Sequence, residues 1–306
     1  MAFRCWFHGR TRAAAALAVG LAGLLSGCQG PPAAERNDDQ IVVAGRRYHT
    51  GTRVVTWEDP AGYNAYAAER PPGPRKGLPA DADLAALRRT VDQFVLHYDG
   101  CGLSKICFAT LRGRSLSVHF LLDLDGTVYQ TLDLRDRALH ATTSNDRSIG
   151  IEIANLGAYA PGNTNLLDQW YRRDAHHRAY LQVPKAAGDP RLLTPNFTAR
   201  PDRPELIRGT LQGRPLVQYD FTPEQYAALS RLTAELCRIF PGIKCDFPRD
   251  RQGRLVTRKL PDEALAKYHG LLGHWHIQEN KEDPGPAFQW SRLLHDARLL
   301  LRQGGS

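Results

Sequence analysis

The sequence predicts an α/β fold, in which helices cover both faces of a β-sheet. Two apolar runs, 94–98 and 148–154, have the length and composition of buried strands, and helical patterns lie before and after them. The clearest helix spans 222–240, where Thr222 is a capping residue, Pro223 occupies the first turn and apolar side chains recur at helical spacing. Because strands and helices interleave along the chain, a layered α/β arrangement is expected.

The N-terminal residues have the pattern of an export signal. Three arginines precede an apolar run at 13–25, which is shorter than the roughly 20 residues that a membrane-spanning helix requires. Residues 25–28, Leu-Ser-Gly-Cys, resemble a bacterial lipobox, which predicts that the signal peptide 1–27 is removed and that Cys28 carries a lipid. An ordinary secretory peptide with an incidental cysteine is the alternative.

Residues 28–40 are rich in Pro, Ala and charged groups and have no apolar period, which is typical of a flexible tether. The predicted localisation is therefore that of an exported lipoprotein, anchored in a membrane through Cys28. In a bacterium with two membranes, Gln29 after the cysteine, where Asp would retain the protein, predicts the periplasmic face of the outer membrane.

The composition indicates a mildly basic protein. The formal net charge is +8, and it falls to +5 when the predicted signal, with three arginines and no acid, is removed. This excess suits an anionic polymer such as peptidoglycan, although a solvated basic surface is the simpler explanation of the charge alone. The sequence has no Lys/Arg cluster with interleaved aromatics, so nucleic acid is not an expected partner. The length fits one large domain, or one domain with insertions.

Four cysteines remain once Cys5 and the predicted lipid site are set aside. An even number in an exported protein predicts two disulfides. Of the three possible pairings, Cys101–Cys107 and Cys237–Cys245 are favoured because each closes a short loop, and each would contribute about 2–4 kcal/mol. A second metal site is the alternative, but the spacing lacks a Cys-x-x-Cys pair.

Residues 41–80 are expected to form a β extension followed by a stiff, Pro-rich connector from residue 70 onward. Short strands joined by glycine turns are predicted at 41–43, 46–48 and 52–57. A helix is predicted from Asp81 to about residue 91, since the aspartate can cap it and leucines follow at helical spacing.

The rest of the chain alternates strands, helices and loops. Further strands are predicted at 117–122, 127–132 and 271–274, with a hairpin turn at 123–126 between the first two. Further helices are predicted at 263–268 and 288–301, the first of them after a polar loop at 246–260. Residues 157–218 show little periodicity and are interpreted as a long insertion with one short helix near 168–180.

Two histidines and one aspartate are candidate ligands for a catalytic metal ion. His97 ends a predicted buried strand, and His274 and Asp283 lie on either side of a short loop near the C-terminus. Two His and one Asp suit a catalytic zinc whose fourth position stays open for water. An ammonium, Lys281, precedes the aspartate by two residues. Glu152 lies among apolar residues of a predicted strand, which is an expensive place for an unpaired carboxylate.

The order of these motifs resembles that of the type 2, zinc-dependent N-acetylmuramoyl-L-alanine amidases, the family that includes T7 lysozyme and the peptidoglycan recognition proteins. The segments that carry the resemblance are the strand with His97, 117–120 with the 125–126 turn, Asn145 before 148–152, and 273–288. The resemblance covers about 85–302, within a predicted domain at 81–302. Insertions at 157–218 and 246–268 interrupt it, and 41–80 has no counterpart.

The resemblance implies a single mixed sheet flanked by helices, a Zn²⁺ cofactor and peptidoglycan or muropeptides as partners. The implied reaction is hydrolysis of the amide bond between N-acetylmuramic acid and L-alanine. With the lipobox, the whole chain resembles the lipoprotein amidases of this family. By position, the zinc ligands are His97, His274 and Asp283. Glu152 and Lys281 match the catalytic glutamate and lysine of the family.

Five other histidines are weighed against the same pattern. His140 matches a family position near the substrate groove, and His119 is expected to be structural. His276 stands where the family usually has Asp, and the interval from His274 to Asp283 is one residue shorter. Either departure is compatible with a re-routed loop in which His276 competes as a ligand. Asp283 is kept, because its spacing from Lys281 and the Pro-Gly-Pro that follows are intact. The two histidines at 176–177 are expected on a surface helix of the insertion.

Two other classes of protein remain as alternatives. A muropeptide-binding lipoprotein of the same fold would bind without cutting, and such proteins lose a metal ligand, whereas here the ligands, Glu152 and Lys281 are all in place. A zinc peptidase that cuts within stem peptides would be expected to carry a His-Glu-x-x-His helix, and the sequence has none.

Overall fold

The computed structural model describes residues 38–303, whereas 1–37 and 304–306 lie outside the described part. All of the described residues belong to one compact unit.

Several predictions fall on residues that the structure does not describe. They are the signal peptide at 1–27, the lipid on Cys28 and nearly all of the tether at 28–40. Of the helices that are described, none is both long and apolar enough for a membrane span.

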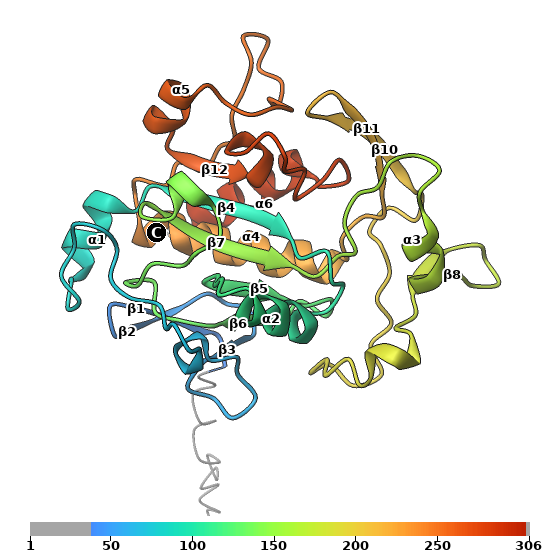
Figure 1. Ribbon diagram of the computed structural model, residues 1–306, viewed down its shortest axis with the longest axis horizontal. Coiled ribbons are helices and arrows are strands. Elements are labelled where there is room, and N and C mark those ends of the chain that lie inside the picture. The colour runs from blue at the N-terminus through green and yellow to red at the C-terminus, as the bar shows by residue number, and fades with distance from the viewer. Residues whose placement is uncertain (1–37, 304–306) are drawn as a thin grey trace, which may run out of the picture. The chain divides into compact units, whose positions relative to one another are not determined.

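A six-stranded sheet forms the centre of the fold (Figure 1). Its strands are β3 (Val54–Thr56), β4 (Gln93–Tyr98), β5 (Phe120–Leu122), β6 (Val128–Gln130), β7 (Ser148–Ile153) and β12 (Gly270–Gly273). They run in the order β12-β4-β7-β5-β6-β3. The first four are parallel neighbours, β5 and β6 are antiparallel, and β6 pairs with β3 in parallel. The predicted α/β class with a mixed sheet is confirmed.

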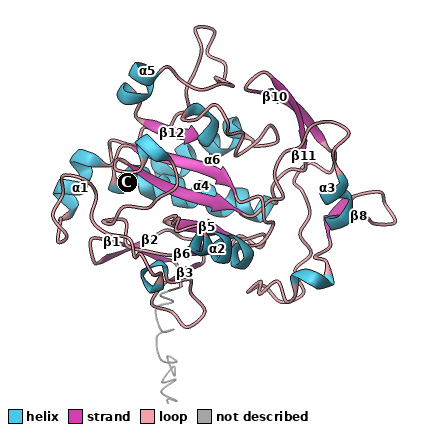
Figure 2. Ribbon diagram, viewed as in Figure 1, coloured by secondary structure: helices cyan, strands magenta, loops and turns pink. Residues whose placement is uncertain are grey.

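Helices flank this sheet, as Figure 2 shows. The α-helices are α1 (Leu84–Thr90), α2 (Ser104–Gly113), α3 (Asn165–Trp170), α4 (Pro223–Ile239), α5 (Asp262–Lys267) and α6 (Trp290–Gln303). Short 3-10 turns are η1 (Ala65–Ala67), η2 (Thr142–Ser144), η3 (Lys185–Ala187) and η4 (His274–His276). In α4, the hydroxyl of Thr222 accepts from the backbone N–H of Gln225, and the Gln225 side chain accepts from the Thr222 N–H, as the capping pattern predicts.

Alternate side chains of β4 and β7 point to opposite faces of the sheet. Leu96 and Ile151 belong to the apolar core that α4 and α6 cover. Their neighbours in sequence, His97 and Glu152, therefore point to the other face. Because β4 and β7 are parallel with His97 opposite Glu152 in register, these two polar side chains stand next to each other. The register of β4 and β7 therefore places two residues of the candidate site side by side.

The N-terminal extension is part of the same fold. β1 (Gln40–Val43) and β2 (Arg46–His49) form an antiparallel hairpin, and β3 is an edge strand of the central sheet. Ile41 and Val43 are buried in the main apolar core. The strands predicted in 41–57 are therefore present, and they pack on the domain instead of lying apart from it.

Arg75, in the connector that follows, is fully buried and anchors the connector. Its guanidinium donates to the carbonyls of Leu134 at 2.9 Å and Ser148 at 2.8 Å, and it lies 3.0 Å from Nε2 of His119. Burial lowers the pKa of Arg75 to about 10, so the side chain is a cation at neutral pH. Nδ1 of His119 in turn accepts from the N–H of Gly150, which makes His119 a structural residue of the β7 neighbourhood.

The insertion at 157–218 contains more regular structure than its composition predicts. The helix predicted near 168–180 is wrong beyond Trp170, because β8 (Tyr171–Arg173) and β9 (Ala179–Leu181) form a hairpin there. The ring of Tyr171 stacks on that of Tyr219 at 4.0 Å, and this tertiary contact outweighs the local helical preference. The histidines at 176–177 therefore lie in an exposed hairpin turn and not on a surface helix.

A second hairpin of the insertion, β10 (Ile207–Leu211) and β11 (Arg214–Gln218), is absent from the sequence-based prediction. Its turn consists of Gln212 and Gly213, both with positive φ, at +52° and +73°. Two central residues in this conformation are typical of a tight hairpin turn. The signal in the sequence was a single Gln-Gly dipeptide between strands that are not strongly apolar.

Helix α2 and the cysteines also differ from the prediction. No element is predicted at 104–113, because the buried face of α2 consists of Ser104, Cys107 and Leu111 and makes a weak apolar stripe. All four described cysteines are free thiols, so neither predicted disulfide is formed in this structure. The thiols of each predicted pair do contact each other: hydrogen bonds from Cys107 and Cys237 lower the pKa of Cys101 and Cys245 respectively. The disulfides stay a prediction.

Candidate active site

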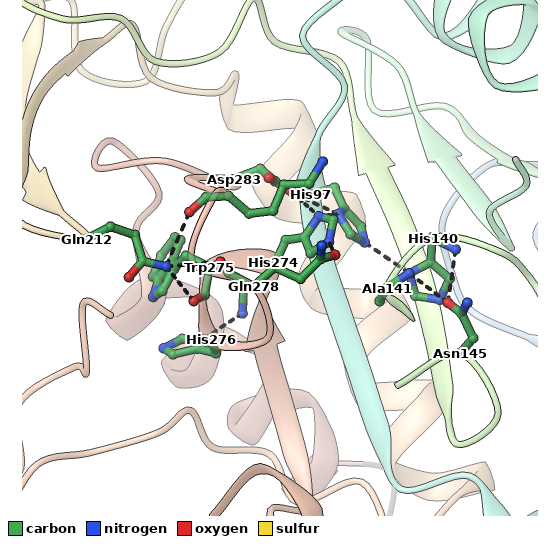
Figure 3. Close-up of polar contacts among 12 residues, drawn as sticks. His97, His140, Ala141, Asn145, Gln212, His274, Trp275, His276, Gln278 and Asp283 are labelled. Atoms are coloured by element: carbon green, nitrogen blue, oxygen red, sulfur yellow. Dashed lines mark hydrogen bonds and ion pairs between the residues drawn. The ribbon is translucent and has the colours of Figure 1, made fainter. Parts of the chain in front are cut away.

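Three side chains from distant parts of the chain converge at the C-terminal ends of β4 and β12 (Figure 3). Oδ2 of Asp283 lies 2.7 Å from Nδ1 of His97 and 3.1 Å from Nδ1 of His274. The two Nδ1 atoms are 3.0 Å apart. All three residues are buried. The structure therefore brings together the three residues that the sequence analysis selects as metal ligands.

The donor set fits a zinc ion. Tetrahedral ligands at the usual zinc distances of about 2.0–2.1 Å lie roughly 3.3 Å from one another, and the three donor atoms here are separated by 2.7–3.1 Å. Among the described residues, these side chains form the group of His, Cys, Asp and Glu that could hold a metal. Two imidazoles and one carboxylate leave a fourth zinc position for water or substrate, which is the pattern of catalytic sites.

Electrostatics also favour a bound cation. Burial and the neighbouring His274 together lower the pKa of His97 to about 4, so the ring is neutral at pH 7, as a ligand must be. Burial alone would raise the pKa of Asp283, but His274 and His97 outweigh it and hold that pKa below its usual range. The site therefore presents a carboxylate at Asp283 and a neutral imidazole at His97.

The free ring nitrogens of both histidines have partners. Nε2 of His97 lies 3.0 Å from Nδ1 of His140, whose Nε2 lies 3.2 Å from the hydroxyl of Ser148. Nε2 of His274 lies 2.6 Å from Oε1 of Gln278. If each ligand binds through Nδ1, each Nε2–H donates outward, to His140 and to Gln278. Such contacts orient metal-ligating histidines and select their tautomer.

The His140 backbone is hydrogen-bonded to Asn145, and the His140 ring packs closely against β7 because Gly150 has no side chain. Oδ1 of Asn145 accepts from the N–H groups of His140 and Ala141, at 3.0 and 2.6 Å. A Cβ at Gly150 would lie 2.5 Å from the His140 ring, so a larger residue there would displace the imidazole. The structure thus places His140 beside a metal ligand. Its predicted contact with substrate is untested, although His140 does line the cleft.

His276 is not a competing ligand. Its Nδ1 accepts from the N–H of Gly273 at 2.9 Å, and its Nε2 donates to the carbonyl of Val256 at 2.7 Å. The ring lies apart from the three converging side chains in Figure 3. Both nitrogens form hydrogen bonds with backbone groups, so the structure excludes the alternative in which His276 competes as a ligand.

Glu152 and Lys281 lie in the same cleft as the three ligands, a hollow of about 310 Å³. Glu152 is partly exposed to this cleft. Burial raises the pKa of Glu152 well above its usual value, with further contributions from Asp283 and Asp99, whereas Lys281 lowers it. A carboxyl group with a raised pKa beside a candidate metal site is suited to take up and release a proton.

Asp99 is a half-buried acid that the sequence analysis does not select. Its Oδ1 accepts from the N–H groups of Cys101 and Gly102, each at 2.9 Å, and of Asn155 at 3.1 Å. Burial raises its pKa to about 6 despite these bonds. The carboxyl group ties the turn after β4 to the turn after β7. An Asp-Gly pair two residues after His97 was the available signal.

The loop that carries Lys281 and Asp283 is held by β10 and β11 of the insertion. Nε2 of Gln212 donates to the carbonyls of Trp275 and Gln278, at 2.8 and 3.1 Å. The amide of Gln218 donates to the carbonyl of Pro284 at 3.1 Å and accepts from the N–H of Ala287 at 3.0 Å. Arg214 forms an ion pair with Glu282 at 2.9 Å. The insertion therefore contributes to the position of one candidate ligand.

A family model described as N-acetylmuramoyl-L-alanine amidase matches residues 87–286. Among solved structures, a selenomethionine derivative of AmpD is 17% identical, covering 79% of this chain and 98% of that chain with a TM-score of 0.37. The amidase LysC from Clostridium intestinale URNW is 15% identical, covering 81% and 98%, with a TM-score of 0.37. No curated protein sequence matches the chain significantly.

A third structure is the N-acetylmuramyl-L-alanine amidase AmiD from E. coli, in complex with the substrate anhydro-N-acetylmuramic acid-L-Ala-D-γ-Glu-L-Lys. It is 18% identical, and the match covers 74% of this chain and 65% of that chain with a TM-score of 0.38. The family model itself spans well over half of the sequence and contains all three converging side chains, together with Glu152 and Lys281. The chain therefore belongs to the N-acetylmuramoyl-L-alanine amidase family, type 2.

Proposed function

We propose that this protein is a zinc-dependent hydrolase that cleaves the amide bond between N-acetylmuramic acid and L-alanine in peptidoglycan or its fragments. The observation that carries the proposal is the convergence of His97, His274 and Asp283, next to Glu152 in the β4–β7 register. A zinc ion bound by these three would polarise the scissile carbonyl and lower the pKa of a water molecule to about 7.

The residues of the chain supply the remaining parts of the reaction. Glu152 has a raised pKa and faces the cleft, so it can accept a proton from the attacking water and deliver it to the leaving nitrogen of L-alanine. The Lys281 ammonium lines the same cleft and can donate to the oxygen on which negative charge develops. His140 and Gln278 would keep the ligand rings oriented throughout.

The test is to load the purified protein with zinc, digest a muramyl peptide and identify the products by mass. We expect one zinc per chain and release of a peptide that begins with L-alanine. Glu152→Gln should retain the zinc while its turnover falls about 10²–10⁴-fold. Glu279→Gln, at an exposed position in the same loop, is the matched control and should be active. Full activity after complete chelation would contradict the proposal.

The non-catalytic alternative makes a different prediction in the same assay. A binding protein would hold the muramyl peptide without releasing any product, with zinc present or absent. A complete set of ligands with Glu152 and Lys281 in the cleft favours the hydrolase, because a protein that only binds does not need a carboxyl group with a raised pKa.

We also propose that the protein is exported, that Cys28 carries a lipid anchor and that the anchored protein reaches the outer membrane in a bacterium with two membranes. The support is the lipobox-like sequence 25–28, preceded by a basic and apolar signal and followed by Gln29. Metabolic labelling with a radioactive fatty acid should label the wild-type protein, whereas Cys28→Ser should remain unlabelled. Labelling of the serine variant would refute the assignment of the anchor.

A further inference from the structure

A second hollow lies beside the candidate active site, and the N-terminal connector forms one of its walls. We call it the connector pocket. It has a volume of about 310 Å³ and is lined on one side by η1 and residues 68–74, and on the other by the C-terminal half of α2 and residues 115–118. Residues 65–74 precede the span 87–286 that the family model matches, so this wall belongs to the extension of this chain.

The connector pocket adjoins the catalytic cleft. Leu111, Leu116 and Leu139 line both hollows. Leu139 is 36% exposed, a large apolar side chain open to solvent at the boundary between them. A ligand that extends from the metal site past these leucines would therefore reach the connector pocket.

The wall contributed by the connector is rigidly attached. Arg75 is bound to carbonyls of β7 and its neighbouring loops, as described above, and the carbonyl of Gly73 accepts from the N–H of Arg137 at 2.8 Å. On the η1 side, the hydroxyl of Tyr66 donates to Asp136 at 2.5 Å and accepts from the N–H of Asp133 at 3.0 Å. The pocket is consequently preformed, which reduces the entropy lost on binding.

The charges at the pocket are mostly positive. Arg70 and Arg112 line it and have no ion-pair partner among residues 38–303, whereas the third arginine, Arg137, is paired with Asp146 at 2.8 Å. One acid, Glu69, also lies on the rim. Arg114 stands on the adjoining side of the catalytic cleft, likewise without an ion pair in the described part of the chain. Arg112 donates one N–H to the carbonyl of Ala67 at 3.4 Å, and a guanidinium has further N–H groups for a ligand. Apolar walls with these two guanidinium groups suit a ligand that has methyl groups and a carboxylate.

We propose that the connector pocket binds the carboxylate-bearing end of the stem peptide, while the bond to muramic acid lies at the metal site. The proposal rests on the amidase function proposed above. In the substrate, the lactyl carboxyl group is consumed in the amide bond, so the sugar side is neutral, whereas the stem peptide carries free carboxylates. Charge complementarity with Arg70 and Arg112 therefore assigns this side of the cleft to the peptide.

The test measures binding of a free stem peptide by calorimetry, with no hydrolysis involved. The probes are L-Ala-γ-D-Glu-L-Lys-D-Ala with a free C-terminal carboxylate and the same peptide with both free carboxyl groups amidated. Wild-type protein should bind the free acid about tenfold more tightly, since each charge-assisted contact contributes on the order of 1 kcal/mol. The double variant Arg70→Ala/Arg112→Ala should lose this preference, and Arg70→Lys/Arg112→Lys should recover part of it.

The matched control is Arg89→Ala, which removes an equal charge from an exposed position on α1 and should keep the tenfold preference. A wild-type protein that binds both peptides equally, or a double variant that keeps the preference, would overturn the pocket assignment. The two proposals fail separately in these experiments. Peptide selectivity without hydrolysis of muramyl peptides would refute the amidase but not the pocket, and hydrolysis without selectivity would do the reverse.

Discussion

The two faces of strands β4 and β7 differ sharply in what they bury. One face packs Leu96 and Ile151 against α4 and α6 and is lined mainly by apolar side chains. The other carries His97 and Glu152, with His140 packed over Gly150 between them. Both faces belong to the same strands, so a single backbone register serves stability on one side and chemistry on the other.

The free-energy cost of burying ionisable side chains falls on only one of these two faces. Burial lowers the pKa of His97 and raises that of Glu152, so each side chain is held in the protonation state that costs less when buried. The apolar side chains on the opposite face offset the cost of burying His97 and Glu152, because each large aliphatic side chain buried there stabilises the fold by about 1.5–3 kcal/mol. Substitutions on the two faces should therefore separate folding from metal binding.

The sharpest separation is expected between two adjacent residues of β4. His97→Ala should lower zinc affinity by at least about 10³-fold, because it removes one of three protein ligands. Leu96→Ala should instead lower the free energy of unfolding by about 2–5 kcal/mol and retain one zinc per chain. Zinc titration against a competing chelator and denaturant unfolding measure the two effects.

His276→Asn is the control for this pair, since it removes an imidazole two residues from His274 that is bound only to backbone groups. It should keep the zinc even if it destabilises the fold. Loss of zinc from His276→Asn, or wild-type affinity in His97→Ala, would show that the ligand set is wrong.

The next largest effect is expected at Arg75, which supports the polar face from the connector. Arg75→Met leaves several buried carbonyls without their donor and should destabilise the protein by about 3–5 kcal/mol. Lys76→Met, a substitution at the exposed neighbouring position, should change the free energy of unfolding by no more than about 0.5 kcal/mol. Equal unfolding midpoints for the two variants would mean that the connector is not anchored as described.

A smaller effect is expected at His140. His140→Ala removes the partner of the free nitrogen of His97 and should weaken zinc binding about 10–100-fold. His295→Ala, an exposed histidine on α6, should have no such effect. If His140→Ala changes KM for the muramyl peptide and leaves zinc affinity intact, its role is in substrate binding, as the family pattern implies.

The smallest effect is expected for Glu152→Gln in the zinc-free protein. The folded pKa of Glu152 is raised above its unfolded value of about 4.3, so the folded state holds this proton more tightly. Below pH about 4 the carboxyl group is protonated in both the folded and the unfolded state, so it does not lower the free energy of unfolding. As the pH rises through the folded pKa, the wild-type protein loses free energy of unfolding, because the unfolded state releases this proton more readily. The glutamine variant lacks that loss and should be more stable at pH 8, by on the order of 1 kcal/mol.

Melting temperatures at pH 4, 6 and 8 would check this dependence. The difference between wild type and Glu152→Gln should grow with pH and vanish near pH 4. A variant that is less stable at pH 8 would show that the ionised carboxylate has a stabilising partner, and would weaken its assignment as the group that exchanges a proton.

Much of the central fold was predictable from local pattern. The capping residues at Thr222, the apolar strand before His97 and the alternation around Glu152 each depend on neighbours within a few residues, and each appears as predicted. The hairpins of the insertion and helix α2 were not predicted. Their formation depends on distant contacts, such as Tyr171 stacking on Tyr219, that leave little periodicity in the sequence.

The site divides in the same way. The sequence alone selected the three side chains that converge, because residue type and motif order carry that information. Only the tertiary structure decided that His276 turns away, that His140 faces His97 and that the connector walls a second pocket. Those outcomes depend on hydrogen bonds between side-chain rings or guanidinium groups and backbone groups from distant segments. The spacing of residues in the sequence does not specify such long-range contacts.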